Sequence, residues 1–72
     1  MTLNNMKPGE VGTIESINGD HHLQTRLVEL GLLSGIEIRL IKRTPFKGPV
    51  EIKVRESYLS IRWDDAKMVD IK

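Results

Sequence analysis

Two runs of alternating residues, joined by a proline-rich turn, make up the segment IEIRLIKRTPFKGPVEIKVR at residues 36–55. Apolar and charged side chains alternate over residues 36–40, with Ile41 at the next outward position, and they alternate again over residues 50–55. A period of two is typical of a β-strand with one buried face. Two prolines within residues 44–49 exclude a central strand there and indicate a turn. The segment therefore predicts an antiparallel β-hairpin.

Three further segments have strand character. Residues 11–17 are rich in β-branched side chains, and residues 58–63 and 68–71 alternate between apolar and polar residues. Between the last two, residues 64–67 are predicted to form a turn or a short 3₁₀ segment capped by Asp64.

One helix is predicted over residues 21–30. Three leucines in this segment recur at i, i+4 and i+7, which places them on one helical face. Asp20 precedes the helix as an N-cap, and Gly31 follows at a position that favours a positive φ. A helix of about ten residues is marginally stable alone, so we expect its leucines to pack against the sheet.

Together these segments predict a mainly β fold, a small barrel of about five antiparallel strands with one α-helix (about residues 21–30) between the first and second strands. Closing a bent sheet removes edges that promote aggregation, and the helix is expected to fill one open end. Residues 1–72 are expected to form one domain. The predicted core draws apolar residues from every element: Val11, Ile14, Ile17, Leu23, Leu27, Leu30, Leu32, Ile36, Ile38, Leu40, Val50, Ile52, Val54, Leu59, Ile61, Val69 and Ile71.

Composition excludes several classes of function. The chain has no cysteine, which excludes disulfides, thiolate zinc sites and a cysteine nucleophile. Its formal net charge of +1 is too balanced for a protein whose whole surface binds nucleic acid. No apolar run is long enough to span a membrane, and residues 1–6 lack the features of a signal peptide. We therefore expect a cytoplasmic protein with no direct membrane insertion and, at this size, no catalytic residues.

Charge is concentrated in the predicted hairpin. Residues 39–55 contain six basic side chains and one acidic one, whereas the rest of the chain is net negative. Alternation predicts that Arg39, Ile41 and Arg43 share the outward face, which places an apolar side chain among cations. Phe46, between two prolines, is also hard to bury. Exposed apolar residues beside arginine are typical of interface centres, although a solvated sheet face without a partner is the alternative.

The candidate partner-binding surface is therefore the hairpin tip with a flanking turn. Its two prolines order the turn in advance, which lowers the entropy lost on binding. Its basic side chains would attract an acidic patch on the partner. The candidate residues combine apolar and basic side chains: Leu33, Ile41, Arg43, Pro45, Phe46 and Lys47.

Other polar groups have simpler interpretations. His21 and His22 are helical neighbours that point about 100° apart, so both rarely bind one metal, although a weak contact through Asp20 and His22 stays open. The adjacent carboxylates Asp64 and Asp65 diverge, which favours helix capping over acid–base catalysis. The single tryptophan is expected in the core or at the barrel rim. These residues predict no cofactor and no metal site.

Five short motifs occur in a fixed order along the chain. Pro-Gly-x-x-Gly at residues 8–12 precedes the first strand, and Arg-Leu-x-x-Leu-Gly-Leu at residues 26–32 ends the helix. A small residue and Gly35 follow, then Pro-Phe-x-Gly-Pro at residues 45–49 and Ala-x-x-Val-x-Ile at residues 66–71. The pattern resembles the ferrous iron transport protein A (FeoA) family. The same module is similar to the SH3-like C-terminal domain of iron- and manganese-dependent repressors.

The resemblance implies an SH3-like barrel and a non-enzymatic cytoplasmic accessory protein of ferrous iron uptake. The implied partner is the membrane ferrous iron transporter, contacted at its cytoplasmic GTP-binding domain. Many family members have a proline where this chain has Ser34, which implies a less rigid turn here.

Alternatives stay open beside this implied function. One is a small-barrel nucleic-acid-binding protein, although the three aromatic residues are not spaced as a stacking platform, so no nucleic acid is expected. Another is a metal-responsive regulatory domain, although the ligand set is poor. Self-association through an open strand edge is also plausible from the sequence.

Overall fold

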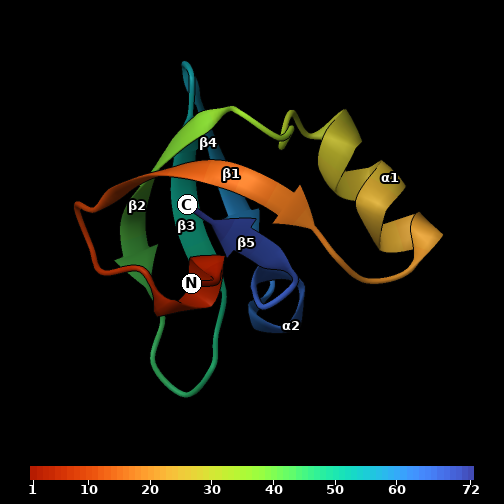
Figure 1. Cartoon of the computed structure of the whole chain (residues 1–72). Helices are drawn as coiled ribbons and strands as arrows, with labels where there is room; N and C mark the ends of the chain where they lie inside the picture. Colours follow the sequence, from red (N-terminus) through yellow and green to blue (C-terminus); the bar gives the residue numbers. More distant parts are fainter.

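The computed structural model describes residues 1–72, in which five strands form one antiparallel sheet (Figure 1). In chain order the strands are β1 (Val11–Ile17), β2 (Glu37–Arg43), β3 (Val50–Val54), β4 (Ser57–Ile61) and β5 (Val69–Ile71). Three short helical elements accompany them: the 3₁₀ turn η1 (Leu3–Asn5), α1 (His21–Glu29) and α2 (Trp63–Ala66). The predicted strands and the predicted helix between the first two strands are confirmed.

The strands are paired in the order β4-β3-β2-β1-β5, and β4 and β5 do not pair with each other. The outer edge of β5 pairs instead with the N-terminus. Thr2 forms a bridge with Asp70, and the N–H of Ile71 donates to the carbonyl of Met1 at 2.6 Å. Because β1 and the N-terminal residues occupy both edges of β5, the predicted closure of the barrel through its last strand is not observed.

Fourteen buried apolar residues form one core on the inner side of the sheet. Every predicted core residue is buried or packs against this core except Val11 and Leu30, each 44% exposed. Val11 precedes the buried Gly12 in β1, so alternation turns its side chain outward. Leu30 lies just beyond the last residue of α1. Three apolar residues of the core were not predicted, namely Leu3, Met6 and Ala66.

α1 begins at the predicted residue, His21, and ends at Glu29, one residue before the predicted end. Asp20 is the N-cap, and its Oδ1 accepts the N–H of Leu23 at 2.8 Å. Gly31 has a φ of +97°, and the N–H of Leu32 donates to the carbonyl of Leu27 at 3.0 Å, as in a Schellman motif. Leu27 is the one buried residue of α1. Figure 1 shows the helix beside the strands, joined to β1 and β2 by loops.

The segment after β4 differs from the prediction. The strand ends at Ile61 rather than at residue 63, and α2 starts at Trp63. Its N-cap is Arg62, which makes no side-chain capping bond, so the expected cap by Asp64 is wrong. Asp64 lies in the first turn, where a negative charge is favoured by the helix dipole, and it pairs with Lys67 at 3.6 Å. No helix of the structure has the length and apolar character needed to cross a membrane.

Candidate functional site

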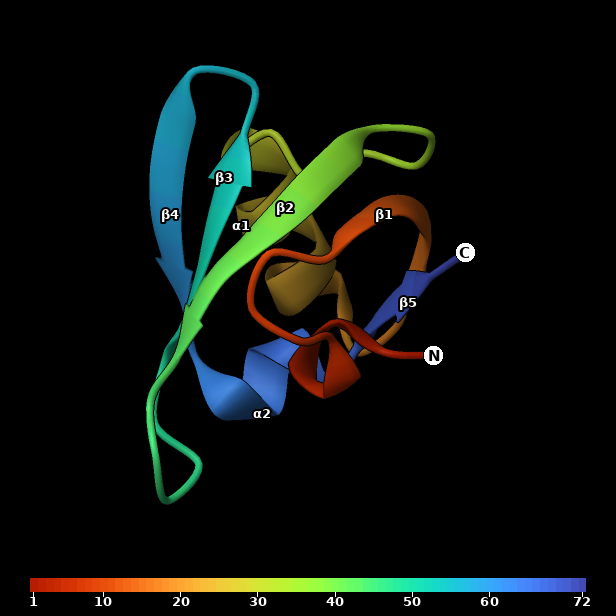
Figure 2. The same cartoon turned by 90° about the vertical axis from the view of Figure 1, so that its left-hand side faces the viewer.

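The loop between β2 and β3, residues 44–49, is the hairpin tip. Figure 2 shows this loop extending away from the body of the sheet. Its ends are joined by hydrogen bonds from the N–H of Thr44 to the carbonyl of Pro49 and from the N–H of Gly48 to the carbonyl of Pro45, both 3.2 Å. The side chain of Phe46 is fully exposed. The tip therefore presents an aromatic ring to solvent on a hydrogen-bonded turn.

Phe46 and Lys47 both have left-handed backbone conformations, with φ of +60° and +61°. A bulky residue rarely adopts this region, and each such residue costs on the order of 1 kcal/mol. Strain of this kind gathers at functional sites when the surrounding structure holds it in place. The exposed ring thus belongs to one of the two residues with a strained backbone.

A β-bulge in β2 changes which side chains face outward. The pairing with β3 shifts between Leu40 and Lys42, so Ile41 has no partner and is 37% exposed. After the bulge Arg43 lies opposite Val50, a buried residue of the core face. The prediction that Arg39, Ile41 and Arg43 share one outward face is therefore wrong at Arg43, because the extra residue inverts the alternation.

Arg43 instead meets the single tryptophan. Its guanidinium lies 5.7 Å from the ring centroid of Trp63, within cation–π range. A shallow cavity of about 360 Å³ next to this ring joins the hairpin tip to α2, lined by Lys47, Pro49, Arg62, Trp63 and Asp64. The candidate surface thus includes Trp63, which the sequence placed in the core or at the rim and the structure leaves half-buried beside the core. We call Ile41, Arg43, Pro45, Phe46, Lys47 and Trp63 the tip surface.

Leu33, the remaining candidate residue, lies elsewhere. It belongs to the loop before β2, whereas the hairpin tip follows the other end of this strand. Seven strand residues at about 3.3 Å each separate the two ends by roughly 20 Å. Leu33 follows the C-terminal end of α1, where Val28 and Leu30 are also exposed, and we call these three apolar residues the α1 patch. The sequence predicts no apolar surface here, because the leucine spacing assigns Leu30 to the core.

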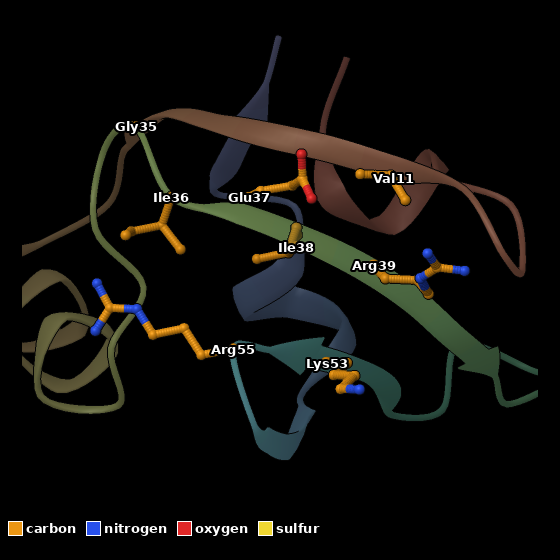
Figure 3. Close-up of a pocket in the computed structure, with 8 residues that line it drawn as sticks. All are labelled: Val11, Gly35, Ile36, Glu37, Ile38, Arg39, Lys53 and Arg55. Atoms are coloured by element: carbon orange, nitrogen blue, oxygen red, sulfur yellow. The ribbon is translucent and has the colours of Figure 1, made fainter.

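The outer face of the sheet carries a cationic groove of about 380 Å³ (Figure 3). Figure 3 shows Arg55 reaching toward the loop at Gly35 and Ile36, with Lys53 and Arg39 along the neighbouring part of the face. None of these three cations forms an ion pair within the chain, and Lys53 Nζ lies 5.5 Å from the ring centroid of Tyr58. Three of the six basic residues predicted for the hairpin therefore line this groove, together with the carboxylate of Glu37.

The other polar constellations are used within the fold. The carboxylate of Asp20 accepts the capping bond of α1, and His21 and His22 are exposed on the first turn. Asp65 pairs with Arg26 at 2.6 Å, which links α2 to α1. The structure groups no three His, Asp or Glu side chains so that they could hold a metal ion.

Comparisons with known proteins agree with this geometry. A family model described as the FeoA domain matches residues 1–72. The chain is 25% identical over 71 residues to the putative Fe(2+) transport protein A of Campylobacter jejuni, covering 99% of this chain and 96% of the relative. It is 24% identical over its full length to the Fe(2+) transport protein A/Fe(2+) transporter FeoB fusion protein of Porphyromonas gingivalis, of which it spans 8%.

Solved structures show the same architecture. A crystal structure of an iron uptake regulatory protein (FeoA) superposes with a TM-score of 0.92 at 30% identity, covering 100% of this chain and 95% of the other. The FeoA of Stenotrophomonas maltophilia, described as an SH3 domain protein, gives 0.86 at 26% identity, covering 100% and 89%. A manganese-dependent transcriptional repressor shares the fold, with a TM-score of 0.89 at 17% identity over 96% of this chain and 39% of the repressor. The chain has the SH3-like fold and belongs to the FeoA domain family, whose members are non-catalytic accessory proteins of ferrous iron transport.

Proposed function

We propose that this protein regulates ferrous iron uptake in the cytoplasm by direct contact with the GTP-binding part of the membrane ferrous iron transporter. The observation that carries the proposal is the Porphyromonas gingivalis relative, in which a region similar to the whole of this chain is fused to the transporter FeoB. Fusion holds two proteins at a high effective concentration, which favours partners that act in contact.

We further propose that the tip surface makes this contact. Phe46 is an exposed aromatic anchor, and Trp63 lies across the shallow cavity from the same loop. Arg43 and Lys47 provide positive charge beside these rings. Aromatic and arginine side chains dominate the binding energy of many interfaces, and cations at the rim attract an acidic patch on the partner.

Regulation by contact needs a difference in affinity. A binding protein shifts its partner between two conformations only if it binds one conformation more tightly. We therefore expect the affinity for the transporter to change with the guanine nucleotide bound to it. Equal affinity with and without nucleotide would leave contact but remove the regulatory part of the proposal.

The first experiment measures binding to the intact transporter in detergent or nanodiscs, with and without guanine nucleotide. Phe46→Ala is expected to weaken binding by about 1–3 kcal/mol, because an exposed aromatic side chain is lost from the centre of the interface. The melting temperature should stay within about 2 °C of wild type, because Phe46 is fully exposed in the free protein.

Leu33→Ala provides the matched control. It also shortens an exposed apolar side chain, but at the far end of β2. Binding by this variant is expected to equal that of wild type. Full binding by Phe46→Ala together with weak binding by Leu33→Ala would move the contact to the α1 patch and refute the tip surface.

A further inference from the structure

The two edges of the sheet differ in whether their backbone groups are hydrogen-bonded. At the β5 edge the N-terminal residues add backbone hydrogen bonds, since Met1 and Thr2 pair with Asp70 and Ile71. At the opposite edge Figure 2 shows no segment beside β4. No backbone hydrogen bond outside its pairing with β3, and no side-chain hydrogen bond, involves any residue of Ser57–Ile61. The outer edge of β4 is therefore an unused row of donors and acceptors.

β4 also lacks the features that usually protect an exposed edge. Its sequence, Ser-Tyr-Leu-Ser-Ile, contains no charged residue and no proline, and it has no bulge against β3. Natural edge strands are normally shielded by such devices, because an unprotected edge pairs with another strand. An edge that is left open while the other is covered is a surface for strand addition.

The turn before β4 determines which backbone groups point outward. Arg55 and Glu56 join β3 to β4, and Val54 lies opposite Ser57. A four-residue turn of this kind closes with a hydrogen bond between its first and last residues, so Val54 and Ser57 form a bonded pair. Bonded and non-bonded pairs alternate along an antiparallel ladder. The N–H and C=O groups of Tyr58 and Ser60 therefore point away from β3.

We propose that β4 pairs antiparallel with β4 of a second copy of this chain, which joins two sheets across a two-fold axis at Leu59. In this register Tyr58 faces Ser60 of the second copy, so the outward backbone groups meet in bonded pairs. Leu59, which packs against the core, meets Leu59 of the second copy and continues the apolar face across the axis.

The flanking residues make this register self-complementary. Glu56 on one side of β4 comes opposite Arg62 of the second copy, and the two-fold axis repeats this pair. Both side chains are exposed, and neither forms an ion pair within the chain. Shifting the register by two residues in either direction removes the opposition of Glu56 and Arg62. The charges next to β4 therefore favour a second copy as its occupant.

The first test uses charge reversal and sedimentation velocity at concentrations from about 10 µM to 1 mM, the range of weak dimers. Wild type should show a reversible monomer–dimer equilibrium. Glu56→Lys and Arg62→Glu should each weaken self-association by about tenfold or more, because each converts both facing pairs into like charges. An equimolar mixture of the two variants should recover dimers, because both pairs are then opposite in charge. The assay needs no transporter, so its outcome is separate from that of the proposed function.

Two outcomes would overturn the proposal. One is a wild-type chain that stays monomeric at the highest concentration. The other is a pair of single variants that associate as wild type does, or whose mixture recovers nothing, since either result would exclude this register.

A second test uses the absence of cysteine from the chain. Leu59→Cys places two thiols across the axis at a non-bonded pair, whose Cα atoms lie about 4.5 Å apart, within disulfide range. Ser57→Cys is the matched control, because its two copies are about 13 Å apart along the paired strands. Mild oxidation should cross-link the first variant and leave the second without a disulfide, and the reverse would refute the register.

Discussion

β2 connects two exposed apolar surfaces that are held in different ways. At its end the hairpin tip presents Phe46 on a loop whose side chains lie outside the core. At its start the α1 patch follows a helix end that is fixed by Leu27 and Leu32, both buried. The tip can therefore change without loss of the fold, whereas changes beneath the α1 patch alter the core itself.

The charge of the two surfaces differs as well. Two cations, Arg43 and Lys47, flank the tip, whereas an exposed carboxylate, Glu29, lies between Val28 and Leu30 of the α1 patch. Charges beside a contact surface change how fast a partner associates and how strongly salt opposes binding, and their sign selects the charge of the partner. Substitutions at the tip should therefore alter recognition, whereas substitutions beneath the α1 patch should alter stability.

The largest effect is expected from Leu27→Ala. The side chain is 1% exposed and is the only buried one of α1, so its loss leaves a cavity between helix and sheet. Such truncations cost about 2–5 kcal/mol, comparable to the whole stability of a small domain. Urea unfolding followed by circular dichroism should show a chain that is largely unfolded in buffer. A folded variant with wild-type stability would mean that α1 contributes nothing to the core.

Gly31→Val is expected to cost about 1–3 kcal/mol, because a β-branched residue is strained at a φ of +97°. No atom lies within 4 Å of the position a Cβ would take, so backbone strain alone is measured. Gly31→Asn should lose much less, because asparagine tolerates the left-handed region. Equal losses in the two variants, measured by thermal unfolding, would contradict the assignment of the cost to backbone strain.

Arg43→Glu should act on recognition rather than on stability. Its guanidinium stacks on Trp63 at the surface, so the melting temperature should fall by only a few degrees. Association with the transporter should slow, and its dependence on salt should weaken, because a cation facing the partner has been reversed. Stopped-flow binding at two ionic strengths measures both effects. An unchanged association rate would remove Arg43 from the contact.

The strands could be predicted because apolar and polar residues alternate along them, which gives each strand one buried face. The region where α1 ends could be predicted because a glycine follows its three regularly spaced leucines. The β-bulge could not, since Leu40, Ile41 and Lys42 continue an ordinary strand composition and only the pairing with β3 shows the extra residue. The burial of Leu3 and Met6 was missed for a similar reason. It depends on the N-terminus covering β5, about seventy residues away in sequence.

The candidate site was predicted in part. The exposure of Phe46 followed from its two flanking prolines, which keep the turn out of the sheet. Leu33 was grouped with it although the two lie at opposite ends of β2, because the sequence does not show which end of a strand a loop will reach. Trp63 belongs to the tip surface for two reasons. β4 ends at Ile61, before the predicted residue 63, and the bulge in β2 turns Arg43 toward the tryptophan ring. The end of β4 and the orientation of Arg43 both depend on how the strands pair in the folded protein.

The smallest expected effect tests whether the hairpin tip is strained. Lys47 has a φ of +61°, a conformation that costs an L-residue about 1–2 kcal/mol and glycine almost nothing. Glycine also raises the entropy of the unfolded chain, which destabilises the folded protein by about 0.5–1 kcal/mol. The net effect of Lys47→Gly should therefore be a stabilisation of only about 0.5 kcal/mol, or roughly 2–4 °C in melting temperature.

Lys42→Gly is the matched control, because Lys42 lies within β2 and has no positive φ. It carries the same entropic cost without any relief of strain, so it should lower the stability by about 0.5–1 kcal/mol. The sign of the difference between the two variants, measured by differential scanning calorimetry, decides the point. If both are destabilised alike, the left-handed turn stores no strain, and the exposure of Phe46 then has to be explained by its two prolines alone.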